Sequence, residues 1–318
     1  MGRFLGIDTS CYTTSAAIYD SEEGLINEER IGLTVKPGKR GLSQSEMVFQ
    51  HVRNLPVILK KMSPYFKHME GIGVSSFPRR RADSYMPAFL VGKGIAETVS
   101  ITSGIPLFEF SHQENHAMAA IMSAPQLWGN AFYMMHLSGG TQDILFADWN
   151  HEGISIKDLF HSVDITAGQF IDRIGVSLGL SFPAGKKMEE LARCSCNEYQ
   201  VPVSGLKDAF SFAGAETKVQ RDIQSGKYAA EDIAHGVLQS IGDSLEKVIA
   251  CNYFIAHTPF VAVGGVMSNL YLRKRMIEIC KDCHLKPYFA ESDFSSDNAA
   301  GNAFGAFMRY KNEGIYGS

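Results

Sequence analysis

Apolar and polar positions alternate at the start of the chain in a way that predicts a β-hairpin. An apolar run at residues 4–7 is followed by small polar residues at 8–15 and by a second apolar run at 16–19. The same pattern recurs where the run at 132–137 meets the turn Ser138–Gln142 and a further strand at 144–147. Backbone N–H groups at such a tip can bind an anion. Asp8, Thr9 and Ser10 are therefore candidates for contact with a phosphate.

The remaining periodicity predicts alternating helices and strands. Helices are expected at about 43–62 and 87–103, and strands at 71–75 and 105–109, which favours an α/β lobe. The second half is predicted to be helical from about 168 to 250. A strand at 260–263 and a helix from about 270 follow. A last helix at 297–310 carries a face of alanine and glycine, which suits close packing against another backbone.

The two hairpins indicate two lobes built alike. Glycines at Gly139, Gly140, Gly264 and Gly265 let backbone amides approach a phosphate without a Cβ in the way. We therefore predict a two-lobed α/β fold of the actin-like ATPase (ASKHA) class with RNase H-like lobes, which would bind an adenine nucleotide such as ATP through its phosphates. The N-terminal lobe is expected at 1–128. The C-terminal lobe is expected at 129–318, with a helical insertion at about 160–250 and a last helix that packs back on the first lobe.

Composition then limits the partners. The chain has 318 residues, 45% of them hydrophobic and 20% charged, as is usual for a globular protein. A net charge of -4 gives no overall attraction to nucleic acid or anionic lipid. Contact with tRNA would therefore need local basic patches. The candidates are Arg79–Arg81, the cluster of Lys36, Lys39 and Arg40, and the cluster Arg273–Arg275. The first could equally be a solvated loop, and each of the other two, taken alone, is most often ordinary surface.

The same reasoning predicts a cytoplasmic protein. Six irregularly spaced cysteines are too few for a disulfide framework in a chain of this length. No signal peptide is apparent, and no apolar stretch reaches the roughly 20 residues of a membrane helix. We therefore expect no membrane contact.

His112 and His116 are the first candidates for metal binding. Residues four apart on a helix share a face, so both imidazoles could bind one ion, although two unrelated polar residues at a helix start would give the same spacing. A zinc protease needs a glutamate directly after the first histidine, and Gln113 occupies that position. Glu114 lies roughly 200° around the helix from His112. A metalloendopeptidase is therefore unlikely.

A third ligand must come from elsewhere, and Asp297 is the candidate. An aspartate at a helix start is more often an N-cap, so both roles stay open. Two nitrogens and one carboxylate would leave coordination positions for oxygens of a substrate.

Taken together, these motifs resemble the TsaD family of tRNA threonylcarbamoyladenosine transferases, which older annotation calls O-sialoglycoprotein endopeptidases. The resemblance spans nearly the whole chain. It rests on the histidine pair and on the segments Gly6–Cys11, Leu137–Gln142, Gly168–Asp172, Leu178–Gly185, Ser204–Lys207, Gly264–Asn269 and Ser296–Asn298.

The resemblance implies an activity and a set of site residues. The chain would transfer threonylcarbamoyl from threonylcarbamoyl-adenylate to the adenosine beside the anticodon of certain tRNAs, with ATP or ADP as related ligands and with family partner subunits. One divalent ion (iron, zinc or magnesium) would be held by His112, His116 and Asp297. The adenylate would contact Leu137, Ser138, Gly139, Gly140, Thr141, Asp172, Gly185 and Asn269.

The chain also departs from the family pattern. Tyr12 and Thr13 stand where the family usually has an Asp-Glu pair, and Gln169 stands where a glutamate is usual. A loop with Arg79, Arg80 and Arg81 replaces a Gly-Pro-Gly loop, which would favour an anionic ligand. These departures suggest an alternative function, in which a divergent paralogue binds metal and nucleotide as a partner or regulatory subunit without turnover.

Overall fold

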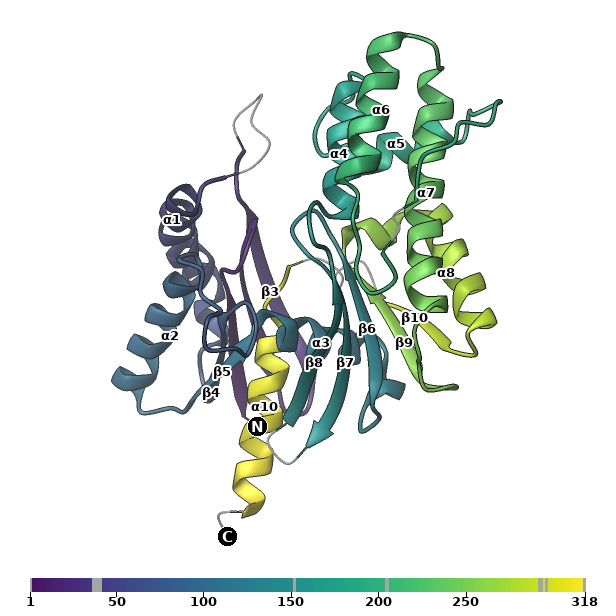
Figure 1. Ribbon diagram of the computed structural model, residues 1–318. Coiled ribbons are helices and arrows are strands. Elements are labelled where there is room, and N and C mark those ends of the chain that lie inside the picture. The colour runs from purple at the N-terminus through teal and green to yellow at the C-terminus, as the bar shows by residue number, and fades with distance from the viewer. Residues whose placement is uncertain are drawn as a thin grey trace. The chain divides into compact units, whose positions relative to one another are not determined.

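The computed structural model describes residues 2–35, 42–150, 153–203, 206–290, 294 and 297–316. Within them the chain forms two five-stranded sheets flanked by helices (Figure 1). The strand orders are β3-β2-β1-β4-β5 and β10-β9-β6-β7-β8. When the strands of each sheet are numbered from its own first strand, and the second sheet is followed from β8 to β10, both sheets have the order third, second, first, fourth, fifth. The predicted repetition of one α/β plan is confirmed.

The first sheet consists of the strands β1 (Arg3–Asp8), β2 (Thr13–Asp20), β3 (Gly24–Gly32), β4 (Met69–Phe77) and β5 (Leu107–Ser111). β1 and β2 form the predicted hairpin, with Leu5 opposite Ile18. β1, β4 and β5 run parallel. Because parallel strands end at the same edge of a sheet, Asp8 and Ser111 lie at one edge.

Helices cover both faces of the first sheet. α1 (Gln44–Met62) and α2 (Phe89–Ser103) pack on the face that carries Leu5 and Ile7. α10 (Ala300–Tyr316) packs on the other face, where Phe4 meets Ala306. Gly6 of β1 leaves room for the backbone of Ala299 and Ala303. The small-residue face of the last helix therefore serves the close packing that its sequence predicts.

The second sheet consists of the strands β6 (Phe132–Leu137), β7 (Gln142–Asn150), β8 (Gly153–His161), β9 (Pro259–Val263) and β10 (Lys286–Phe289). Its helices are α4 (Ala167–Ser177), α5 (Gly185–Ala192), α6 (Ala213–Ser225), α7 (Ala230–Ala250) and α8 (Leu270–Asp282). Apolar side chains of these helices and of β6 and β9 form one core. Among the described residues, no helix is both long enough and apolar enough to cross a bilayer.

Most of the predicted elements are confirmed, but three strands were not predicted. β3 has the sequence GLINEERIG and lies at the edge of its sheet, where its side chains are half-buried. β8 and β10 are also edge strands. Edge strands tolerate charged side chains because one side of the strand faces solvent, so their hydrophobic pattern is weak.

Contacts along the chain divide it into two compact units. One unit comprises Met1–Asn130, Ala147–Ile156 and Asp293–Ser318, and the other comprises Ala131–Phe146 and Lys157–Ser292. α10 packs on β1, β4 and α3 (His112–Ser123) and so belongs to the first unit. Both units are discontinuous in sequence, and the division into continuous lobes at 1–128 and 129–318 stays a prediction.

Candidate metal centre and substrate-binding residues

The histidine pair occupies the first turns of α3. Ser111, the last residue of β5, is the N-cap: its hydroxyl accepts from the backbone N–H of Glu114, and the Glu114 carboxylate accepts from the N–H of Ser111 at 2.6 Å. Such a capping box fixes where a helix begins. The helix therefore starts directly at the carboxyl edge of the first sheet, with His112 as its first residue and His116 one turn later.

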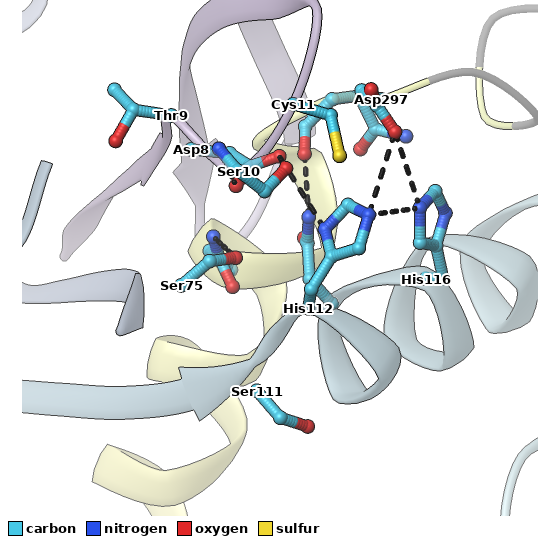
Figure 2. Close-up of polar contacts among 12 residues, drawn as sticks. Asp8, Thr9, Ser10, Cys11, Ser75, Ser111, His112, His116 and Asp297 are labelled. Atoms are coloured by element: carbon cyan, nitrogen blue, oxygen red, sulfur yellow. Dashed lines mark hydrogen bonds and ion pairs between the residues drawn. The ribbon is translucent and has the colours of Figure 1, made fainter. Parts of the chain in front are cut away.

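The two imidazoles and the Asp297 carboxylate converge on one point (Figure 2). The Nε2 atoms of His112 and His116 lie 3.1 Å apart. Each of them lies 3.5 Å from Oδ1 of Asp297. Both histidines are buried, whereas the Asp297 side chain keeps 20% of its surface exposed. The structure thus brings together the three residues for which the sequence predicted a metal site.

The charges of the three groups suit a cation. Burial would raise the pKa of Asp297, but hydrogen bonds from His112 and His116 and their positive charge hold that pKa well below its usual value. Burial lowers the pKa of His116, and the neighbouring His112 lowers it further. Asp297 is therefore a carboxylate and His116 a neutral imidazole near pH 7, the forms in which both bind metals.

The distances fit a shared ion. Ligand atoms about 2.1 Å from one ion lie about 3.0–3.4 Å apart when the angle between them is 90–109°. The separations of 3.1 and 3.5 Å are close to that range. Among the described residues, these three side chains form the one group of at least three histidine, cysteine or acidic residues that is close enough to hold an ion. The donor set therefore fits a divalent ion.

Asp8, Thr9 and Ser10 are fully buried near this centre, and their side chains form hydrogen bonds with other groups of the protein. The Ser10 hydroxyl donates to Asp8 at 2.9 Å, and the Thr9 hydroxyl donates to the carbonyl of Ala88 at 2.9 Å. Oδ2 of Asp8 lies 3.8 Å from Nδ1 of His112 (Figure 2). These contacts hold the β1–β2 turn in place, and phosphate binding by the three residues stays a prediction.

Cys11, at the same turn, lies near Asp297 but outside the ligand set (Figure 2). Burial raises the pKa of its thiol well above the usual value, and the negative charges of Asp297 and Asp8 raise it further.

The arginine loop is largely engaged in contacts with acidic residues. The Arg80 guanidinium donates to both carboxylate oxygens of Glu114, at 3.1 and 3.0 Å, and to the carbonyl of Glu109. Arg81 is exposed and lies 3.4 Å from Asp83. The backbone N–H of Arg79 donates to the Ser84 hydroxyl. Glu114 is thus bonded to Arg80 and to the backbone N–H of Ser111. Anion binding by these arginines stays a prediction.

The glycine turn after β6 is open. Gly139 and Gly140 are exposed, and a Cβ on either would meet no atom within 4 Å. The Ser138 hydroxyl accepts from the N–H groups of Gly140 and Thr141. At the base of the turn, Gly168 of α4 lies directly against the Ser138 backbone. A phosphate could therefore approach this backbone without meeting a side chain of the turn.

A chain of contacts links this turn to the other predicted adenylate residues. Asp172 of α4 accepts from the N–H of Ala184, the residue before α5 and Gly185. Glu189 of α5 accepts from the N–H of Leu270 at the start of α8, and Asn269 is the N-cap of α8. Burial raises the pKa of Asp172. α4, α5 and α8 thus place these candidates in one neighbourhood of the second unit.

Of the other two basic clusters, one lies outside the described residues, and in the other, two arginines contact groups of the protein itself. Lys36, Lys39 and Arg40 lie outside the described residues, as do Ser204, Gly205 and Ser296 of the family motifs. Arg275 contacts Asp243, Glu246 and Glu278. Arg273 donates to the carbonyl of Met267.

Sequence reasoning missed two neighbours of the centre. His51 of α1 is buried; its ring bonds the Thr14 hydroxyl at 2.8 Å and the Cys11 carbonyl at 3.1 Å, and so links the β1–β2 turn to α1. Asn115, which lies between the two histidines in sequence, contacts the residue after Asp297. No local pattern signals either contact, because each partner is distant in sequence.

Comparison with known sequences points to one family. A family model described as tRNA N6-adenosine threonylcarbamoyltransferase (TsaD) matches residues 84–304. The proteins of that name from Persephonella marina and Sulfurihydrogenibium sp. are 28% and 30% identical to this chain. Each alignment covers 98% of this chain and 91% of the relative.

Solved structures confirm the fold class. The activator of 2-hydroxyisocaproyl-CoA dehydratase from Clostridium difficile is 15% identical, with a TM-score of 0.58 over 99% of this chain and 97% of that one. HypF from T. kodakarensis is 13% identical, with a TM-score of 0.62 over 98% of this chain and 48% of that one. A ROK glucokinase from Streptomyces griseus has a TM-score of 0.53 at 10% identity, over 96% of this chain and 99% of that one. The two-lobed, actin-like ATPase fold is thereby confirmed.

Proposed function

This chain belongs to the TsaD family of tRNA N6-adenosine threonylcarbamoyltransferases, and from this premise we propose how it works. It is an acyl transferase that modifies tRNA. Its donor is threonylcarbamoyl-adenylate, and its acceptor is the amine of an adenosine beside the anticodon. The amine nitrogen bonds the carbamoyl carbon, the bond between that carbon and the phosphate oxygen breaks, and AMP and a proton are released. The observation that carries the proposal is the convergence of His112, His116 and Asp297 on one point at the positions of the family's metal-binding motif.

His112, His116 and Asp297 hold one divalent ion, with iron and zinc best suited to two imidazoles and a carboxylate. A bound ion would act as a Lewis acid that polarises the acyl group of the substrate. The protein's own part is to present ionised Asp297 beside neutral His116, a state that the low pKa of each group supports. Burial of both histidines limits competition by water.

The second unit binds the adenylate. The open backbone of Gly139 and Gly140 receives the phosphate, and Ser138 and Thr141 shape that turn. Asp172, Gly185 and Asn269 lie against the adenosine, with Leu137 at the end of β6. The adenine amine is a weak nucleophile, so its reaction with a free acyl donor is slow. The main contribution of the protein is to hold the acyl carbon and the amine next to each other.

Transfer assays test this proposal. Purified protein, threonylcarbamoyl-adenylate, tRNA and the family's partner subunits are incubated, and threonylcarbamoyladenosine is measured by mass spectrometry of digested tRNA. We expect product with the wild type and none with His116→Ala. Asp282→Ala, which changes an exposed residue at the end of α8, is the control and should remain active. Binding of the adenylate without product would instead support the non-turnover paralogue.

A further inference from the structure

We propose that Asn115 is a positioning residue that holds the Asp297 carboxylate against the two histidines. This inference rests on the proposed metal centre, because it concerns how the ligands of that centre are kept together. It goes beyond the ligand set, since Asn115 itself touches neither an ion nor the substrate.

Asn115 links α3 to the segment that carries Asp297. It lies one position before His116 and is 1% exposed. Its Nδ2 donates to the backbone carbonyl of Asn298 at 2.6 Å, a contact between residues 183 positions apart. Asn298 follows Asp297 directly, so the hydrogen bond ties the helix of the histidines to the turn that carries the carboxylate.

Asp297 lies before the first residue of α10, so the helix itself does not fix its position. The hydrogen bond from Asn115 to Asn298 supplies a contact that does. Asn298 also bonds the first residue of that helix, since its Oδ1 accepts from the N–H of Ala300 at 3.0 Å. Asn298 thus contacts α3 through its backbone carbonyl and α10 through its side chain. The distance between the Asp297 carboxylate and the histidines is therefore set by how α3 and α10 dock.

α3 and α10 dock closely at this point. A Cβ on Gly301 would come within 2.6 Å of Oδ1 of Asn115 and still closer to its backbone carbonyl. That Oδ1 is buried and has no hydrogen-bond partner in the described part of the chain. A buried polar atom without a partner costs about 1–3 kcal/mol. An apolar residue would avoid that cost, so packing alone does not account for an amide here, whereas its N–H donor does.

Asn302 of α10 provides a matched control for Asn115 of α3. It is also buried, and its Nδ2 donates to the carbonyl of Ile7 at 2.8 Å and to the Ser75 hydroxyl at 2.9 Å. Its Oδ1 likewise has no partner within the described chain. Asn302 therefore anchors α10 to β1 and β4 with the same chemistry, without contacting the Asp297 turn.

The experiment compares metal affinity in wild type, Asn115→Ala, Asn115→Ser and Asn302→Ala. Each full-length protein is stripped of metal, and its affinity for Zn²⁺ is measured by competition with a chromophoric chelator. The absorption spectrum with Co²⁺ reports the coordination geometry. Chemical unfolding of the metal-free proteins measures the purely structural effect. The serine variant keeps a small polar side chain and replaces the alanine variant if that one does not fold.

We expect the Asn115 variants to bind Zn²⁺ about 10-fold to 100-fold more weakly and to show a changed Co²⁺ spectrum. Asn302→Ala should lose stability but keep its affinity within about twofold of the wild type. Wild-type affinity in the Asn115 variants, or equal losses in the Asn115 and Asn302 variants, would overturn the inference. If the wild type itself binds no Zn²⁺ or Co²⁺, the proposed metal centre fails, and that outcome is distinct from failure of the Asn115 variants alone.

Discussion

At the scale of single residues, the centre combines groups whose charges favour a cation. Asp297 stays ionised because two imidazoles bond it, and His116 stays neutral because it is buried. Nearby, Asp8 is a buried carboxyl group at 3.8 Å from His112. The pKa of Asp297 is lowered, whereas burial raises the pKa of Asp8. Asp297 is therefore ionised more readily than Asp8.

Asp297→Ala should abolish metal binding while leaving the fold intact. The substitution removes the one carboxylate of the ligand set, and two neutral imidazoles alone hold a divalent ion weakly. Metal content after gel filtration should fall from about one equivalent to background, with an unchanged circular dichroism spectrum. Metal content equal to that of the wild type would remove Asp297 from the site.

Asp8→Asn should make the metal-free protein more stable at neutral pH. Burial raises the pKa of Asp8 from 3.8 to about 6, in spite of the opposing effects of His112, Ser10 and Ser75. The folded protein therefore holds this proton more tightly than the unfolded chain does. The stability that Asp8 contributes is present below pH 3.8 and is lost as the pH rises through about 6.

Urea unfolding of the chelator-treated protein from pH 4 to pH 7 measures this effect. Relative to the wild type, Asp8→Asn should gain about 1–3 kcal/mol at pH 7 and little at pH 4. Asp282→Asn, at an exposed site, is the control and should show no such trend. A gain that is the same at every pH would mean that ionisation of Asp8 is not its cause.

At the scale of elements, caps and glycines place the centre. The capping box of Ser111 and Glu114 starts α3 at the end of β5, and Arg80 bonds the same Glu114 from the loop between β4 and α2. Next to α3, α10 approaches the sheet over Gly6 and Gly73. The positions of α3 and α10 together decide where the ligands meet.

Gly73→Ala should weaken the docking of α10. A Cβ at Gly73 would fall on the backbone carbonyl of Asn302, which cannot rotate away as a side chain can. We expect a loss of about 3 kcal/mol in the free energy of unfolding. Gly32→Ala, where a Cβ meets nothing within 4 Å, is the matched control and should change it by less than about 0.5 kcal/mol. Similar values for both variants in urea titrations would argue against tight packing at Gly73.

At the scale of the whole molecule, two similar sheets divide the candidate residues between two units. The histidine pair and Asp297 belong to the first unit, and the glycine turn with Asp172, Gly185 and Asn269 belongs to the second. Binding of the ion is therefore linked to the folding of the first unit, in which its ligands come from segments far apart in sequence.

Metal binding should raise stability by mass action. At free Zn²⁺ 100-fold above its dissociation constant, the free energy of unfolding of the metal-binding unit should rise by about 2.7 kcal/mol. Thermal unfolding over a series of buffered Zn²⁺ concentrations measures the rise, and Asp297→Ala should show none. An equal rise in that variant would place the stabilising ion elsewhere on the protein.

The sequence by itself determined the α/β plan, the two hairpins with their small-residue turns, and a helix that presents His112 and His116 on one face. These features depend on periodicity and turn chemistry within short segments, which a single sequence displays. The family motifs supported Asp297 as the third metal ligand and predicted the adenylate-binding residues. Several dispersed motifs in the same order identify one family far better than any single motif does.

Only the tertiary structure decided which distant residues meet. It placed Asp297 at 3.5 Å from both histidines, joined Asn115 to Asn298, and paired Arg80 with Glu114. It also added the edge strand β3, whose charged sequence has no clear alternation. The physical reason is that such contacts arise from the common edge of parallel strands and from the return of α10 across the sheet, and neither leaves a periodic signal in the segments concerned.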